Sequence, residues 1–384
     1  MRVEYLKKLL KRQGVRNVHG AQIESRSEAW PKVAIVVLNW NGWRDTVECL
    51  ESLQKLSYPN YRVILVDNGS IDDSVNQILG WCAGKVVVRS KFFEYDPANK
   101  PVNWIEYDRL IAEMGGVPEE EEKVFRDLPP GRCLILIRNE DNLGFAEGNN
   151  VGIRYALANG YDYICLVNND TVVSPDFLRF LVERADGDSS LGILGGKIYR
   201  YDEPSVLWYA GGVVSLFGRG PGYVIKRSET NEFSYVSFVS GCLMFLRAEL
   251  LRNVGLLDSY FFFGAEDADI CLRAIRSGFR IGIEPRAVIW HKVARTYDKY
   301  SQQHIYYVYR GKIAFTKKHL HFLVWWLWIS FFVLYLLLVV PQRQFFRTKS
   351  LKVVANTITG GLKALRDGVK RSGKTNIWQG YGKI

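Results

Sequence analysis

Three carboxylates stand within four positions of one another, at Glu266, Asp267 and Asp269, in the run FFFGAEDADICLRA. At the start of a helix, carboxylates complement the helix dipole and cap its free amides, and this role accounts for at least one of them. It does not explain why the acidic turn follows directly on an aromatic run. A carboxylate beside apolar surface can act as a general base near neutral pH. We therefore expect proton-transfer chemistry at this turn.

A second group of short polar side chains follows the predicted strands, at the point where each strand ends. One such residue alone is usually turn chemistry, but four successive strands ending this way favour a ligand site, because ligands of open α/β sheets bind beyond the carboxyl ends of the strands. These side chains suit ribose, base edges and metal ions. They are Asn39, Asn41, Asp67, Asn142, Asn168 and Asp170.

His291 follows an apolar, strand-like segment at residues 281–289. A lone histidine is more often an ordinary surface or core side chain. With Asp170 available to share an ion, however, a metal-ligand role becomes a specific hypothesis.

Alternating strands and helices must position these residues. Short β-branched runs predict strands at 32–38, 61–66, 133–138 and 163–167, and helical patterns follow at 46–56 and 148–159. This alternation predicts an α/β fold with a mostly parallel central sheet and flanking helices. Residues 92–130 form a polar insertion that we expect to be a surface excursion. Neither GxGxxG nor GxxxxGK[ST] occurs, so a bound diphosphate would depend mainly on a metal ion.

The net charge of +11 is distributed unevenly along the chain. Residues 1–30 carry a net +4 and residues 310–384 a net +13, which leaves −6 for residues 31–309. A basic footprint at the two ends favours an anionic membrane surface as partner and argues against nucleic acid, whose footprint would lie on the recognition domain. Apolar residues at helical spacing among lysines predict a basic amphipathic helix at residues 1–13, with a solvated helix as the alternative.

Residues 322–340 are uncharged and rich in Trp, Phe and Leu, and basic residues flank them on both sides. Nineteen residues just reach the span of a bilayer core, but a full crossing would translocate one cationic flank, against the positive-inside bias. A single span and a helix in one leaflet both stay open, and a buried soluble helix is a third alternative. Residues 351–374 predict another basic amphipathic helix.

Seven motifs in this order resemble the family 2 glycosyltransferases of the GT-A fold, in particular their rhamnosyltransferase-like branch. The likeness covers about residues 31–320. Its motifs are VVLNWNG (36–42), VDNGS (66–70), NLGFAEGNNVGI (142–153), LVNNDT (166–171), SGCLMF (240–245), FFFGAEDADICLRA (261–274) and VIWH (288–291).

The resemblance implies a set of roles. Asp267 would be the catalytic base, with Glu266 and Asp269 as neighbours that orient it or the acceptor, and Gly241 would allow donor and acceptor to approach closely. Asp170 and His291 would hold a divalent metal, Mn²⁺ or Mg²⁺. The nucleotide sugar would bind at Leu38, Asn39, Asn41, Asp67, Asn142, Gly144, Asn150, Asn168 and Asn169.

Two departures refine this expectation. Asn168 stands where the DxD metal motif has its first Asp, which removes one anionic ligand. The QxxRW motif of processive synthases is absent, because Gln302 and Gln303 precede Tyr306 to Arg310 without an Arg-Trp pair. We therefore expect an inverting, non-processive transferase that moves a sugar from dTDP-rhamnose or a UDP-hexose to a hydroxyl. A nucleotidyltransferase and a non-catalytic membrane-bound homologue are the alternatives.

The expected organisation has four parts: an amphipathic segment at 1–30, a GT-A catalytic domain at 31–320, a hydrophobic membrane segment at 321–341 and a basic tail at 342–384. Residues 321–384, with 1–13 as a second candidate, would attach the enzyme to the cytoplasmic face of the cell membrane. The acceptor would be a glycan or a lipid-linked molecule.

Overall fold

The computed structural model describes residues 30–215, 222–225, 231–293 and 301–370. The chain divides into two units, Met1–Trp30 and Pro31–Ile384, and the second holds the central sheet and its helices. The helix predicted at 1–13, and the part of the predicted C-terminal helix beyond residue 370, lie outside the described residues.

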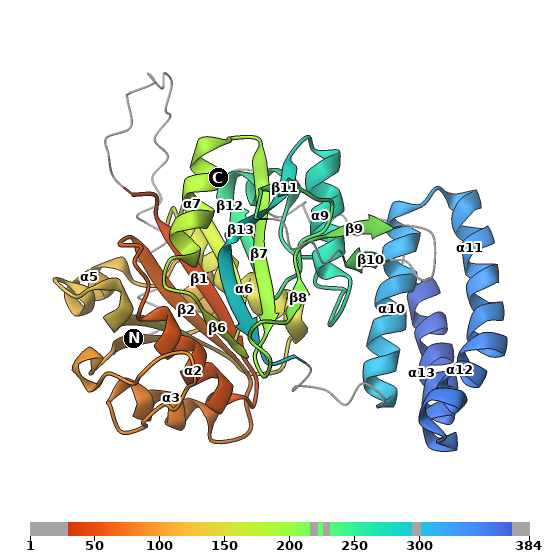
Figure 1. Cartoon of the computed structure of the whole chain (residues 1–384), viewed down its shortest axis with the longest axis horizontal. Helices are drawn as coiled ribbons and strands as arrows, with labels where there is room; N and C mark the ends of the chain where they lie inside the picture. Colours follow the sequence, from red (N-terminus) through yellow and green to blue (C-terminus); the bar gives the residue numbers. More distant parts are fainter. Residues whose placement is uncertain (1–29, 216–221, 226–230, 294–300, 371–384) are drawn as a thin grey trace, which may run out of the picture. The chain divides into compact units, whose positions relative to one another are not determined.

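An eleven-stranded sheet forms the centre of this unit (Figure 1). Its strands are β1 (Val33–Asn39), β2 (Tyr61–Asn68), β3 (Asn103–Asp108), β4 (Cys133–Asn139), β5 (Tyr163–Asn168), β6 (Thr171–Val173), β7 (Leu191–Arg200), β8 (Leu207–Tyr209), β11 (Ser234–Tyr235), β12 (Leu243–Arg247) and β13 (Arg280–His291). They lie in the order β3-β4-β2-β1-β5-β12-β7-β13-β11, with β6 paired to β13 and β8 to β7. A separate hairpin joins β9 (Gly212–Ser215) and β10 (Gly222–Ile225).

The first five strands of this order are parallel, and β12 runs antiparallel to both β5 and β7. The predicted α/β fold with a mostly parallel sheet is therefore confirmed. Asn39 pairs in register with Asp67, and Leu38 with Asn168. The polar residues that end neighbouring strands consequently share one edge of the sheet.

Helices cover the sheet and follow its strands in the chain. They are α2 (Trp43–Leu53), α3 (Ser74–Cys82), α4 (Arg109–Glu113), α5 (Pro118–Phe125), α6 (Gly144–Ala158), α7 (Phe177–Gly187), α8 (Ala248–Val254) and α9 (Glu266–Arg276). In α6, Gly148 and Gly152 face β1 so closely that an added Cβ would lie 2.7 Å from a Leu38 methyl carbon and 2.6 Å from a Val36 methyl carbon. This close approach fixes where the N-terminus of α6 meets the sheet edge.

The segment at 92–130 differs from the expectation. It lies at the edge of the sheet, as a surface excursion would, but it also contributes β3, which pairs in parallel with β4, and the short helices α4 and α5. The outer strand alternates exposed and partly buried residues, and so its pattern is weaker than that of the four strands predicted from the sequence.

Four helices follow β13: α10 (Gln302–His319), α11 (Phe322–Leu334), α12 (Val340–Thr348) and α13 (Leu351–Lys370) (Figure 1). A π-helical turn, Tyr335–Val339, joins α11 to α12, so that Phe322–Thr348 is one continuous helix of 27 residues. The turn precedes Pro341, whose ring has no N–H to donate and disturbs the regular helical ladder. Among the described helices, this one is long and apolar enough to cross a membrane.

Candidate functional site

A cavity of about 250 Å³ opens at the carboxyl ends of the parallel strands. Polar and aromatic side chains share its wall, which combines amide groups for hydrogen bonding with flat rings for stacking. Its lining residues are Leu38, Trp40, Asn41, Gly42, Asp45, Asn68, Asn142, Gly144, Phe145, Asn149, Val167, Asn168, Asn169, Asp170, Gly241, Phe262 and Phe263.

The turn after β1 brings Asn41 to the cavity. Asn41 has a left-handed backbone (φ +50°), and its Oδ1 accepts hydrogen bonds from the N–H groups of Ile71 (2.9 Å) and Asp72 (3.3 Å). Asn39 and Asp67 lie behind this turn and are buried. The Asn39 amide donates to Asp67 Oδ1 over 2.8 Å. The structure therefore places Asn41 among the lining residues, and Asn39 and Asp67 as supports of the loop.

The turn before α6 forms a second wall through Asn142 and Gly144. Asn142 Oδ1 accepts from the Gly144 N–H over 2.9 Å, and Gly144 has a φ of +79°. A Cβ at Gly144 would lie 2.5 Å from the Phe262 carbonyl oxygen, so the position requires glycine. Asn150 does not reach the cavity. Its side chain is buried and bonds to both the carbonyl and the N–H of Leu257, which is a structural contact.

Asp170 and His291 meet because β6 pairs with β13, with His291 opposite Thr171. His291 Nε2 lies 3.1 Å from Asp170 Oδ1. Both side chains are buried, and apart from this mutual contact Asp170 Oδ1 has no hydrogen-bond partner among the described residues. A buried carboxylate oxygen beside an imidazole fits a divalent cation.

This candidate metal site is incomplete on protein ligands alone. The described residues contain no group of three or more His, Cys, Asp or Glu side chains that could hold an ion. Asn168, in place of a carboxylate, lines the cavity beside Asp170. The pair fits an ion that takes its remaining ligands from water and from substrate phosphates, as Mg²⁺ commonly does.

Glu266 and Asp267 begin α9, and both are buried. Asp267 Oδ2 accepts a hydrogen bond from the Gly241 N–H (3.3 Å), and Oδ1 accepts from the Ala268 N–H (2.8 Å). Burial raises the pKa of Asp267 to about 6, although these N–H groups oppose the shift. Burial and the neighbouring Asp267 raise the pKa of Glu266 well above its usual value. Burial thus raises the pKa of both carboxyls, and the charge of Asp267 adds to the rise at Glu266.

Gly241 lies between the carboxylate of Asp267 and the strand end that carries Asn168 and Asp170. Its N–H contacts Asp267, it lines the cavity, and the next residue, Cys242, accepts a hydrogen bond from the Asn168 N–H over 3.1 Å. A Cβ at Gly241 would lie 3.1 Å from the Phe145 ring, so a larger residue here would press against this ring. Of the three distant residues Asp170, Asp267 and His291, Asp170 lines the cavity. His291 contacts Asp170, and Asp267 accepts from the N–H of Gly241, which also lines the cavity, so each lies one contact behind the wall.

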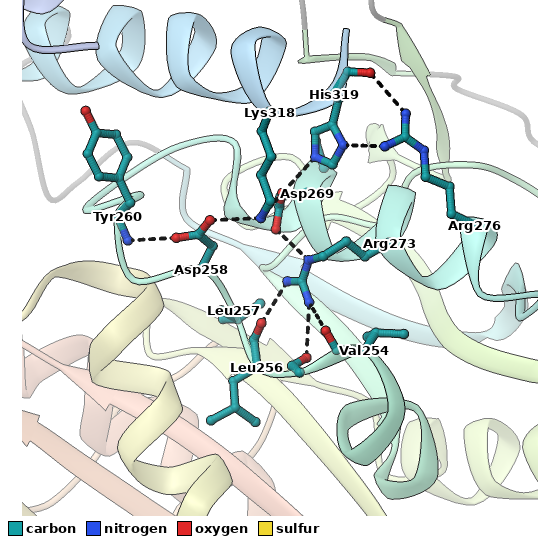
Figure 2. Close-up of polar contacts among 12 residues, drawn as sticks. Val254, Leu256, Leu257, Asp258, Tyr260, Asp269, Arg273, Arg276, Lys318 and His319 are labelled. Carbon is teal, nitrogen blue, oxygen red and sulfur yellow. Dashed lines mark hydrogen bonds and ion pairs between the residues drawn. The ribbon is translucent and has the colours of Figure 1, made fainter. Parts of the chain in front are cut away.

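Asp269 points away from this cavity, although the sequence predicted it beside the acceptor or donor sugar. It is fully buried in an ionic cluster (Figure 2). Its carboxylate lies 2.7 Å from Lys318 Nζ, 2.8 Å from His319 Nε2 and 2.7 Å from Arg273 Nε. Although burial opposes it, the hydrogen bond from His319 and the charges of Arg273 and Lys318 hold the pKa of Asp269 well below its usual range. Asp269 therefore ties α9 to the end of α10.

Several site residues were missed from the sequence. Trp40, Phe262 and Phe263 line the cavity, and the Phe262 ring stacks on Tyr307 of α10 with ring centres 4.4 Å apart. The aromatic run at 261–263 was visible, but not the direction of each ring.

Lys292, next to His291, was also missed. It is buried, and its Nζ pairs with Glu48 (2.6 Å) and with Asp45, which lines the cavity. Burial alone would lower the pKa of Lys292, but these two carboxylates raise it above its usual value. The lysine therefore keeps its charge beside the candidate metal site.

Two family models match the chain. The model described as "Glycosyl transferase family group 2" matches residues 163–360, and "Glycosyl transferase family 2" matches residues 34–95. The first alone covers slightly more than half of the chain.

Curated relatives agree with these models. Poly-beta-1,6-N-acetyl-D-glucosamine synthase of Staphylococcus aureus (strain COL) is 26% identical over 189 residues, covering 49% of this chain and 43% of that protein. The dTDP-rhamnosyl transferase RfbF of Shigella flexneri is 25% identical over 167 residues, covering 44% of this chain and 54% of that protein. The chain thus matches about half the length of these relatives.

A solved structure shares the architecture. The crystal structure of GalNAc-T7 with UDP, GalNAc and Mn²⁺ superposes with a TM-score of 0.51 at 14% identity, covering 76% of this chain and 48% of that one. At this identity the likeness concerns the fold alone. The fold is of the GT-A type, as the sequence motifs predicted.

Proposed function

The chain belongs to glycosyl transferase family group 2, and from this premise we propose that it is an inverting, non-processive glycosyltransferase. Its donor would be a nucleotide sugar, dTDP-rhamnose or a UDP-hexose. Its acceptor would be a hydroxyl of a lipid-linked or cell-surface glycan. The observation that carries the proposal is that Asp170 lines one cavity while His291 and Asp267 contact its lining residues Asp170 and Gly241.

The proposed chemistry begins at Asp267. An acceptor hydroxyl is a poor nucleophile, and Asp267, ionised above a pKa of about 6, would take its proton as the oxygen attacks the anomeric carbon. Attack from the face opposite the departing nucleotide inverts that carbon. Glu266, whose pKa is raised by burial and by Asp267, would favour its neutral form and so keep a second negative charge out of the pair. Asn41, Asn142 and the ring of Trp40 would hold the nucleotide.

Asp170 and His291 would hold a divalent metal ion, Mn²⁺ or Mg²⁺. Such an ion, when bound, offsets the negative charge that accumulates on a departing diphosphate. Lys292 would add a fixed positive charge nearby, although Asp45 and Glu48 compensate it in part.

The proposed donor, product, number of sugars transferred and membrane attachment are each supported by a separate observation. The likeness to a dTDP-rhamnosyl transferase supports dTDP-rhamnose as donor, and the likeness to a polysaccharide synthase supports a glycan product. The missing QxxRW motif supports transfer of one or few sugars. The basic ends and the apolar helix Phe322–Thr348 support attachment to the cytoplasmic face of the cell membrane.

The direct test replaces the base. With purified protein and a panel of nucleotide sugars, we expect release of a nucleoside diphosphate, and Asp267→Asn should lower turnover by about 10²–10⁴-fold, the usual worth of a general base. Nucleotide binding, measured by calorimetry, should persist. Glu106→Gln, on the edge strand β3, is the matched control and should leave turnover unchanged.

The products separate the alternatives. Released pyrophosphate would point to a nucleotidyltransferase, and release of neither product with any donor would point to a non-catalytic homologue. Normal turnover in Asp267→Asn would remove this residue from the role of base.

A chelator tests the metal. EDTA should abolish transfer, and added Mn²⁺ or Mg²⁺ should restore it, because Asp170 and His291 are then the protein ligands of the required ion. Full activity in EDTA after dialysis would refute the metal assignment while leaving that of Asp267 intact.

A further inference from the structure

The helix Phe322–Thr348 has two different faces. Trp325, Ile329, Phe332, Leu336 and Val340 recur every three or four residues and are buried. Except for Val340, they form a small core with Ile313, against which side chains of α10 and α13 pack, namely Tyr309, Leu365 and Val369. This spacing is that of one helical stripe, so one side of the helix is already occupied by protein.

Between Phe322 and Val339, the remaining surface of the helix is largely apolar and exposed. Phe322, Leu323, Leu327, Phe331 and Leu338 have exposed fractions between 60% and 71%. A contiguous apolar surface of this kind marks an interaction site rather than an ordinary protein surface.

The helices α10 and α13, which pack against Phe322–Thr348, carry charged residues. These charges bear on how Phe322–Thr348 can be oriented relative to a bilayer. Lys317 of α10 donates to the carbonyl of Val369 over 2.6 Å, and its Nζ lies 5.6 Å from the centre of the Trp325 ring. Arg310 and Arg366 also lie on these helices. If Phe322–Thr348 crossed a bilayer upright, the attached helices would bring these charges into the hydrocarbon, which is strongly unfavourable.

Cations border the apolar face. Residues 301–370 contain eleven Lys and Arg and a single acid, Asp367. Arg343, Arg347, Lys349 and Lys352 are exposed near the end of the helix, beside the exposed rings of Phe345 and Phe346. This composition is complementary to the headgroups of an anionic leaflet.

We propose that the helix Phe322–Thr348 lies in the plane of one anionic leaflet, with its exposed face among the acyl chains and both ends on the same side of the membrane. The inference deepens the membrane attachment proposed above, and it explains why both flanks are basic: neither flank is translocated.

This placement would connect the membrane-bound helix to the candidate site through contacts of α10. Arg310 donates to the Tyr260 carbonyl over 2.6 Å, and Tyr307 stacks on Phe262, which lines the cavity. At the other end of α10, Lys318 and His319 hold Asp269 of α9, the helix that carries Asp267 (Figure 2). A lipid-linked acceptor lying in the same leaflet could therefore approach the cavity along α10.

Cysteine accessibility in cells expressing the full chain tests the orientation. All six native cysteines are buried, so His321→Cys and Lys352→Cys, one exposed position before the helix and one after it, would report their own surroundings. With a membrane-impermeant maleimide, both should react in inverted membrane vesicles and neither in spheroplasts. One reacting in each preparation would mean a crossing helix and overturn the proposal, as would recovery of the chain away from membranes.

A matched pair of variants tests the apolar face. Leu327→Glu should weaken binding to phosphatidylcholine vesicles with about 30% phosphatidylglycerol by at least about tenfold. Leu110→Glu, at a side chain of α4 that is 75% exposed, should not. Donor hydrolysis in solution should be equal in both, which separates this inference from the proposed function. Unchanged vesicle binding in Leu327→Glu, with a dimer converted to monomer in gel filtration, would make the face a contact between copies of the chain.

Discussion

At the scale of the residue, the surroundings of two nearby carboxylates, Asp267 and Asp269, shift their pKa values in opposite directions. Asp267 is buried with two N–H donors, and its pKa is raised to about 6. Asp269, two positions later, has three cationic or hydrogen-bonding partners and a pKa well below its usual range. Only the first has the proton affinity of a general base near neutral pH, because a carboxylate held by cations is a poor proton acceptor.

The raised pKa of Asp267 predicts the pH profile. The protonated carboxyl cannot accept a proton, so kcat/KM should rise about tenfold per pH unit below pH 6 and level off above it. Rates measured from about pH 4.5 to 8 with subsaturating donor would show this limb. The residual activity of Asp267→Asn should lack it. A limb centred near pH 4 instead would mean that an unperturbed carboxylate is the base.

At the scale of the element, α9 and α10 are joined by the cluster around Asp269 (Figure 2). Arg273 adds bonds to the carbonyls of Val254 and Leu256, so the same carboxylate also fixes the chain that leads from α8 to α9. The cluster holds in place the helix that carries Asp267.

Removing that carboxylate should destabilise the protein. Asp269→Asn would leave Lys318, His319 and Arg273 without their shared anion, and breaking a buried pair from one side costs about 3–5 kcal/mol. Urea unfolding followed by circular dichroism would measure the loss. Glu106→Gln breaks an exposed pair with Arg138 and should cost no more than about 1 kcal/mol. Equal stability of the two variants would contradict the structural role given to Asp269.

At the scale of the whole molecule, the middle of the chain and its two ends carry net charges of opposite sign. Residues 31–309 carry a net −6, whereas residues 310–384 carry a net +13. If the tail meets an anionic surface as proposed, the acidic residues 31–309 and the basic residues 310–384 would orient the molecule before any apolar contact forms.

Salt should therefore weaken membrane binding without affecting chemistry. Attraction of Lys and Arg to anionic headgroups is screened within a Debye length. Raising KCl from about 50 to about 300 mM should lower the apparent affinity for phosphatidylglycerol vesicles by at least about tenfold. Donor hydrolysis in solution, measured in the same buffers, provides the control. Salt-independent binding would assign the attachment to the apolar face alone.

Local patterns in the sequence were enough to place four strands and the sheet edge at which they end. Strands β1, β2, β4 and β5 follow from short apolar runs, and the polar residues that end them lie in register because parallel strands bring their carboxyl ends to one edge. The acidic start of α9 was also expected from its sequence, and the family resemblance implied that Asp170 and His291 lie together, as their 3.1 Å contact shows.

Which of these side chains face the cavity depends on packing between distant segments of the chain. Successive helical residues point about 100° apart, so Asp267 and Asp269 of one turn look toward different neighbours. Asn39 and Asp67 bond to each other behind the loop after β1. Asn150 bonds to Leu257 instead of reaching the cavity. Those partners are distant in sequence, and a local pattern carries no information on which distant group will pack against a given side chain.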